Sequence, residues 1–213
     1  MTQIAIHPAT ETTDTTTAST SGSTIPATDR AFIPGYTGLR CRACGTEAAD
    51  GPVFVCTRCF GPLEPAYDLD GIRARLTRET IDAREPDVWR WAELLPVPEL
   101  PTTGLTVGES PLTEAPRLAA RIGLAKLWVK DDSRNPSLSF KDRPVSIAAA
   151  RAKAWGYHTL ACASTGNLSA AVAAAAAAHG LRAVVFIPAD LEPAKIAQAR
   201  ALGATVVRVD GPY

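Results

Sequence analysis

One lysine stands at an unusual point in this chain. Lys141 ends a polar loop, residues 135–140, where an alanine-rich segment typical of a helix begins. The first turn of a helix carries unpaired N–H groups and partial positive charge, which disfavour an ammonium ion and favour the neutral, nucleophilic amine. Such an amine can attack a carbonyl group. An ordinary exposed surface lysine is the alternative, because its position at a helix start is by itself only modest support for a functional lysine.

A second polar loop follows further along the chain. It lies between an apolar run, 159–163, and a stretch of small residues, 168–179. The first pattern predicts a buried strand and the second a helix. Open α/β proteins bind ligands at the carboxyl ends of such strands, and a helix start offers N–H donors to an anion. We therefore expect a carboxylate-sized anion to bind here; simple N-capping of the helix is the alternative. The loop consists of Ser164, Thr165, Gly166 and Asn167.

Four cysteines form two close pairs, Cys41 with Cys44 and Cys56 with Cys59. Two such pairs can supply four thiolates to one tetrahedral zinc ion, and without a secretion signal they favour metal over disulfides. Because four thiolates leave no position for water, the predicted site is structural, in a zinc-ribbon-like module. A redox pair and a ribbon that has lost its metal are the alternatives.

The pattern around these groups predicts four parts. Residues 1–35 are rich in Ser and Thr and predict a disordered tail. Residues 36–67 would form the cysteine module, and 68–107 a helical linker or arm. Residues 108–213 alternate apolar strands with helices, which predicts an α/β fold with a parallel sheet. This last part would be the N-terminal portion of a catalytic domain.

Four strands are expected in that sheet, at 125–130, 159–163, 182–187 and 204–209. With their helices they would form part of a doubly wound sheet. Because the last strand would leave an open sheet edge, we expect the chain to be truncated.

Charge and hydropathy exclude some partners. The 22 basic and 22 acidic residues balance, so there is no electrostatic reason to expect nucleic acid or an anionic membrane. No apolar run approaches the roughly 20 residues that span a bilayer, and the N-terminus has no secretory pattern. The sequence therefore predicts a soluble, cytoplasmic protein.

Two motifs in this order, Ser139-Phe-Lys-Asp-Arg143 and Ser164-Thr-Gly-Asn167, resemble those of the fold-type II pyridoxal-phosphate enzymes, the tryptophan synthase beta-like superfamily. Within that group the chain is most similar to threonine synthases. Gly108-Glu-Ser-Pro-Leu112 resembles the opening motif of the group, and 131–136 its lead-in to the lysine. The resemblance covers roughly residues 37–213.

The resemblance implies pyridoxal 5'-phosphate as the cofactor. Lys141 would hold it covalently and later move protons at the substrate carbons. Phe140 would pack beside the cofactor ring, and Asn167 would donate a hydrogen bond to its phenolic oxygen.

The resemblance also implies a substrate-binding set. Arg143 would help to bind a phosphate, although an ion pair with Asp142 or Asp132 is an equal alternative. The groups that would hold the substrate α-carboxylate are Ser164, Thr165, Gly166 and Asn167.

The implied reaction converts O-phospho-L-homoserine and water to L-threonine and phosphate, with an amino acid as the substrate and a homodimer as the common assembly. Threonine or serine dehydratase, cysteine synthase and cysteate synthase share both motifs and are alternatives. A non-catalytic zinc-ribbon protein with a degenerate α/β remnant is the alternative from another class. The glycine-rich loop that holds the cofactor phosphate in this group is not found in the chain, so we expect the isolated chain to bind the cofactor weakly or to be inactive.

Overall fold

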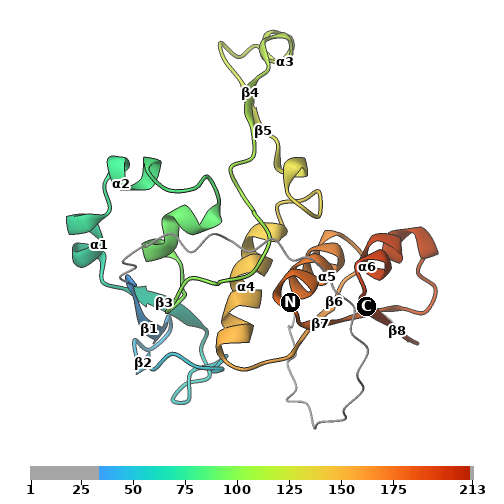
Figure 1. The fold of residues 1–213 in the computed structure, drawn as a ribbon, viewed down its shortest axis with the longest axis horizontal. Coiled ribbons are helices and arrows are strands. Elements are labelled where there is room, and N and C mark those ends of the chain that lie inside the picture. The colour runs from blue at the N-terminus through green and yellow to red at the C-terminus, as the bar shows by residue number, and fades with distance from the viewer. Residues whose placement is uncertain (1–33, 212–213) are drawn as a thin grey trace.

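The computed structural model describes residues 34–211, so nearly all of the predicted tail lies outside the described residues. A small antiparallel sheet comes first, followed by short helices, a projecting arm and a parallel sheet covered by helices (Figure 1). This order confirms the α/β class. In the described part, no helix is both long enough and apolar enough to cross a membrane.

The first sheet has β1 (Tyr36–Cys41) at its centre, with β2 (Glu47–Ala48) and β3 (Leu63–Tyr67) antiparallel on either side. Its apolar core is very small, because only Tyr36, Cys41 and Cys56 are buried among its hydrophobic residues. A module of this size needs a cross-link or a bound metal to be stable.

Short helices connect this sheet to the rest. Helix α1 (Leu69–Arg75) is capped by Asp68, whose carboxylate accepts the Gly71 N–H at 2.9 Å. Helix α2 (Arg78–Asp82) follows, and then the 3₁₀ helix η1 (Val88–Leu94).

Helix η1 builds a second small core. Val88 and Trp89 pack with Val97, Val107 and Ala150, so the extended segment after η1 is fixed against helix α4 (Asp142–Ala154). This core anchors the start of the Gly108 motif to the helix that follows Lys141.

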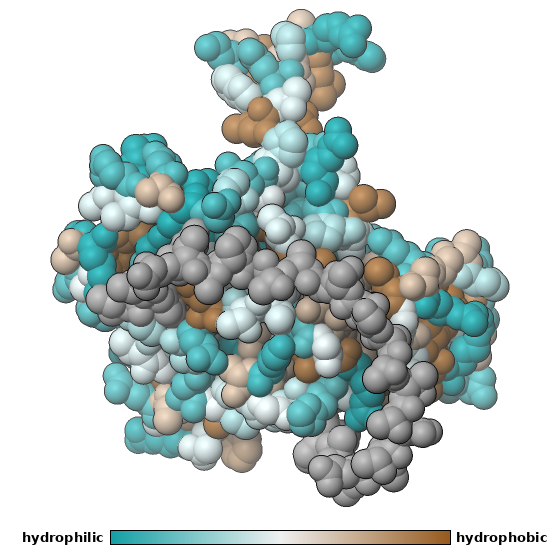
Figure 2. Space-filling model, viewed as in Figure 1, coloured by the Kyte–Doolittle hydropathy of each residue, from teal (hydrophilic) through white to brown (hydrophobic). Residues whose placement is uncertain are grey.

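The arm contains β4 (Leu112–Glu114), α3 (Pro116–Arg121) and β5 (Trp128–Lys130), and it projects from the body of the molecule (Figures 1 and 2). The predicted strand at 125–130 was therefore assigned to the wrong sheet. It pairs antiparallel with β4, Leu112 opposite Lys130, because the short α3 returns the chain directly beside β4.

The parallel sheet has three described strands rather than four, in the order β6-β7-β8. The order does not reverse, so the described part does not show double winding. The strands are β6 (Thr159–Ala163), β7 (Arg182–Pro188) and β8 (Thr205–Val209); the covering helices are α4, α5 (Asn167–His179), η3 (Pro193–Ile196) and α6 (Ala197–Ala201).

Helix α5 lies at the centre of this core. Ala171, Ala173 and Ala176 are fully buried, and α5 contacts α4, β6 and β7. Small side chains let the helix approach its neighbours closely, and Gly180 in the left-handed conformation ends it.

His179, the last residue of α5, makes stability depend on pH. Burial, and secondly the charge of Lys153, lower the pKa of His179 to about 4. The unfolded chain takes up this proton near pH 6.5, so the stabilising effect of the neutral ring is complete above that pH and is lost as the pH falls toward 4. We expect the free energy of unfolding in urea to drop by about 1–3 kcal/mol over that range. His179→Gln should flatten the profile; an unchanged profile would contradict the assignment.

Candidate active site and cysteine cluster

The two polar loops lie at one edge of the parallel sheet. Helix α4 runs toward the edge where β6 begins, and β6 then runs back in the opposite direction. Helix α5 starts where β6 ends, so α4 and α5 begin at the same edge of the sheet. The two helices pack directly on each other. The sheet topology thus brings Lys141 and the 164–167 loop to the carboxyl ends of the strands, where α/β proteins bind ligands.

Lys141 occupies the N-cap position of α4, one residue before the first helical turn in which it was expected. Its backbone N–H donates to Ser139 Oγ at 3.2 Å. Its Nζ lies 5.1 Å from the centroid of the Phe140 ring, which is 53% exposed. Within residues 34–211 no carboxylate pairs with this amine. The amine is therefore accessible beside an exposed aromatic face.

The 135–140 loop is held from within. The Ser137 N–H donates to Asp142 Oδ2 at 2.7 Å, and Gln198 at the start of α6 donates to the Ser137 carbonyl at 3.4 Å. Asp142 is 2% exposed, so its carboxylate is committed to the loop. Leu138 has a φ of 64°, a left-handed conformation that is costly for leucine.

Leu138→Gly is expected to raise stability. Glycine relieves the positive φ, and little packing is lost because Leu138 is 68% exposed. We expect a gain of about 0.5–1 kcal/mol in urea unfolding. The matched control is Leu112→Gly: that leucine is 64% exposed but lies in β4, so its replacement should lower stability. An equal loss in both variants would show that Leu138 is not strained.

The loop at 164–167 leaves the start of α5 open. Gly166 is the N-cap residue, and no side chain caps the helix, so the simple capping alternative for Thr165 or Asn167 is not observed. Ser164 is buried, and its Oγ accepts the Gly166 N–H at 3.3 Å. Asn167 is the exposed first residue of α5. The first N–H groups of α5 are thus available to an anion.

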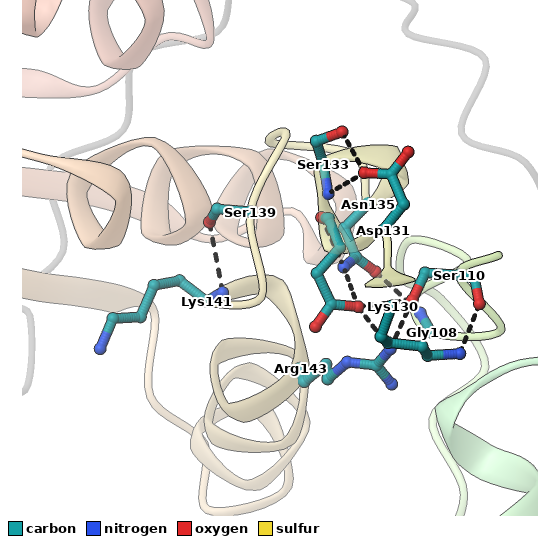
Figure 3. A network of polar contacts seen from close by, with 10 residues as sticks. Gly108, Ser110, Lys130, Asp131, Ser133, Asn135, Ser139, Lys141 and Arg143 are labelled. Carbon is teal, nitrogen blue, oxygen red and sulfur yellow. Dashed lines mark hydrogen bonds and ion pairs between the residues drawn. The ribbon is translucent and has the colours of Figure 1, made fainter. Parts of the chain in front are cut away.

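Arg143 lies away from the lysine amine. Its Nη2 donates to Asp132 Oδ1 at 2.7 Å and to Ser110 Oγ at 3.0 Å. In Figure 3 the Arg143 and Lys141 side chains leave the start of α4 in opposite directions. Of the two acidic partners considered from the sequence, Asp132 is the one that pairs, and this ion pair lowers the pKa of Asp132.

The sequence alone does not predict the polar network around this ion pair. Asn135 Oδ1 accepts the Gly108 N–H at 3.0 Å, and Asn135 Nδ2 donates to the Asp132 carbonyl at 3.0 Å. Ser110 and Asn135 are buried. The sequence contained one signal, the clustering of small polar residues in the two motifs that precede Lys141.

The four paired cysteines converge as predicted from their spacing. Their sulfur atoms all lie within 4.8 Å of one another, with Cys41 and Cys59 at 3.5 Å and Cys44 and Cys56 at 3.7 Å. Four sulfurs at about 2.3 Å from a tetrahedral zinc ion would lie about 3.8 Å apart. The donor set and its spacing therefore fit zinc.

Two similar turns present these thiols. Gly45 and Phe60 each follow a cysteine pair and have positive φ values, 72° and 56°. Gly61 has a different role: a Cβ there would lie 3.0 Å from Cys41 Sγ, so only glycine leaves room for the cluster. A hydrogen bond from the Thr46 side chain is the main cause that lowers the pKa of Cys44 to about 6, which favours its thiolate. Hydrogen bonds with Cys44 and Cys41 raise the pKa of Cys59 to about 12, so the thiolate is not favoured at every cysteine of the cluster.

Much of the chain is similar to known proteins. A family model described as "Pyridoxal-phosphate dependent enzyme" matches residues 104–213. The threonine synthase of Methanosarcina acetivorans is 40% identical over 177 residues, which cover 82% of this chain and 43% of that protein. The threonine synthase of Methanocaldococcus jannaschii is 38% identical over 177 residues, covering 82% and 44%. The chain thus spans less than half the length of these relatives.

Two solved structures are also similar. Apo diaminopropionate ammonia lyase from Escherichia coli has a TM-score of 0.43 at 25% identity, covering 49% of this chain and 34% of that chain. The O-acetylserine-dependent cystathionine beta-synthase from Helicobacter pylori has a TM-score of 0.41 at 24% identity, covering 48% and 35%.

Proposed function

This chain belongs to the pyridoxal-phosphate-dependent enzyme family, and we propose that its protein is a threonine synthase, which converts O-phospho-L-homoserine and water to L-threonine and phosphate. The observation that carries the proposal is the position of Lys141 at the same sheet edge as the open start of α5. Identities of 40% and 38% to two threonine synthases support the choice of reaction.

The residues at this edge fit part of the cofactor. Pyridoxal phosphate offers an aldehyde, a flat ring and anionic groups, which call for an amine, an apolar face and N–H donors. Lys141 supplies an unpaired amine and Phe140 an exposed aromatic ring. Ser137 Oγ is a buried polar atom without a hydrogen-bond partner in the described part. No glycine-rich loop for the phosphate occurs in this part, so the fit is to the reactive end of the cofactor.

Lys141 has two tasks in this proposal. It would hold the cofactor covalently until the amino group of the substrate displaces it, and the freed amine would then take up and return protons at the substrate carbons. Bound pyridoxal phosphate withdraws electrons and makes those C–H bonds acidic, while the protein supplies orientation and proton transfer. The adjacent Phe140 ring would keep the cofactor ring from rotating. Asn167 would donate a hydrogen bond to the phenolic oxygen.

The start of α5 would bind the substrate carboxylate. Its uncapped N–H groups carry partial positive charge, and the hydroxyl and amide groups of 164–167 add directed donors. Binding the carboxylate here would orient the amino acid toward Lys141 across the same sheet edge. Arg143 is given no substrate role in this proposal, because its guanidinium is already paired with Asp132.

We also propose a structural Zn²⁺ ion bound by Cys41, Cys44, Cys56 and Cys59, whose sulfur geometry and small surrounding core support it. The zinc-ribbon character of this module and the four-part division of the chain remain predictions. So do the cytoplasmic location, the homodimer and the lack of a nucleic-acid or membrane partner.

Product analysis with the full gene product tests the reaction. Incubation with O-phosphohomoserine should release phosphate and threonine in equal amounts. Serine or threonine should give little pyruvate or 2-oxobutyrate. Keto-acid formation without phosphate release would favour a dehydratase. Formation of cysteine from a phosphorylated or acetylated serine and added sulfide, or of cysteate from phosphorylated serine and added sulfite, would favour the other synthases. No turnover of any of these substrates by cofactor-loaded protein would overturn the proposal.

A further inference from the structure

We propose that Arg143 and Asp132 are positioning residues. They fix the base of the 135–140 loop that leads into Lys141, and Arg143 does not bind the substrate phosphate. This inference rests on the proposed function, because it deepens the role of the same site. It is carried by a network that joins three segments of the chain: 108–110, 130–135 and the start of α4 (Figure 3).

One carboxylate oxygen lies at the centre of this network. Asp132 Oδ1 accepts from Arg143 Nη2 at 2.7 Å, from Ser110 Oγ at 2.5 Å and from Asn135 Nδ2 at 3.4 Å. Lys130 Nζ donates to the Ser110 carbonyl. The charge of Arg143 is thereby matched by a carboxylate that is held by further donors, so little of it remains to attract a phosphate.

The network pins both ends of the loop that carries the lysine. Asn135 begins the loop and is 3% exposed, with its side chain bonded to Gly108 and Asp132. Arg143 follows Lys141 by two residues. Because both ends attach to the same cluster, the loop has a closed base, and the amine of Lys141 leaves it on the side opposite to Arg143 (Figure 3).

Gly108 shows how closely this base is packed. It has a φ of 96°, and a Cβ at this position would lie 3.1 Å from Arg143 Nη1 and 3.2 Å from the Val88 nitrogen. The guanidinium therefore lies directly against the backbone of the Gly108 motif. A planar group with directed donors suits this position, and the ammonium group of lysine could replace the charge but not the geometry.

Kinetics of the full gene product separate positioning from substrate binding. If the inference holds, Arg143→Gln and Asp132→Asn should each lower kcat by about 100-fold, since small misplacements of a reacting group cost that much. The KM for O-phosphohomoserine should change less than about threefold, and Arg143→Lys should recover only part of the rate. Arg143→Gln and Asp132→Asn should also shift the pH dependence of the visible absorbance of the bound cofactor. A loss of folded protein alone would leave that pH dependence unchanged.

A control variant and two contrary results complete the test of this inference. Arg134→Gln removes an exposed arginine that pairs with Asp131 just before this loop, and it should leave kcat, KM and the spectrum unchanged. The inference fails if Arg143→Gln raises KM tenfold at constant kcat while Asp132→Asn does not. It also fails if Asp132→Asn, the variant to use should Arg143→Gln not fold, retains full kcat and spectrum. Absence of cofactor on Lys141 in the wild-type protein would instead reject the proposed function.

Discussion

Cys41→Ser is expected to reduce bound zinc from about one equivalent to near zero and to unfold the first sheet. Each of the four thiolates is one corner of the tetrahedron, and the sheet around them has almost no apolar core. In small modules that fold around zinc, metal binding supplies about 10–16 kcal/mol, so its loss exceeds what such a sheet can otherwise provide. Metal analysis and limited proteolysis within residues 36–67 would measure both effects.

The matched control is Cys162→Ala. Cys162 is buried in β6 outside the cluster, and burial raises the pKa of its thiol to about 11. That variant should keep its zinc. If Cys41→Ser keeps zinc as well, the cluster is not the metal site.

A glycine pair tests the same cluster without touching a ligand. Gly61→Ala would place a Cβ 2.9 Å from the Ala43 Cβ and 3.0 Å from Cys41 Sγ, whereas a Cβ at Gly51 meets nothing within 4 Å. Zinc affinity should fall about 10–100-fold in Gly61→Ala and stay constant in Gly51→Ala.

Loss of zinc from the cysteine module should also affect helix α4. Arg151 on α4 bonds Asp50, which lies between the two cysteine pairs, and its guanidinium stacks 5.1 Å from the Tyr36 ring centroid. Because α4 begins directly after Lys141, an intact cysteine module supports the helix that carries the site.

Lys141→Ala is expected to abolish covalent cofactor attachment and to lower turnover by roughly 100- to 10,000-fold or more, because one amine both holds the cofactor and transfers the protons. Loss of the visible absorbance on titration with pyridoxal phosphate would report the first effect and phosphate release the second. Lys141→Arg should fail equally, since it keeps the charge but not the nucleophile.

Lys195→Ala is the control. Lys195 is exposed in η3 and takes part in no described ion pair. Its replacement should leave both absorbance and turnover unchanged. Equal absorbance in Lys141→Ala and the wild type would place the cofactor on another group.

Much of the parallel sheet could be predicted because its signals are local. The apolar run at 159–163 coincides with β6, and the small residues before Gly180 form α5. The strand at 125–130 could not be assigned correctly, because its partner is decided by the path of the chain. The short α3 returns it beside β4, and periodicity carries no information about that pairing.

The site, like the sheet, was predictable only where the signal is local in the sequence. Lys141 and the 164–167 loop were found because each lies at a junction between elements, and the topology then fixes their common edge. The partner of Arg143 could not be predicted, because Asp132 and Asp142 are both near in sequence. Only the folded loop shows that Asp142 accepts the Ser137 N–H and that Asp132 pairs with Arg143.

Reduction with borohydride after addition of pyridoxal phosphate, followed by peptide mass spectrometry, tests the central claim most directly. One reduced cofactor adduct is expected, on the peptide that contains Lys141. The other lysines of the chain, Lys126, Lys130, Lys153 and Lys195, should remain unlabelled. An adduct spread over several lysines, or one that excludes Lys141, would contradict the assignment of this residue as the cofactor-binding lysine.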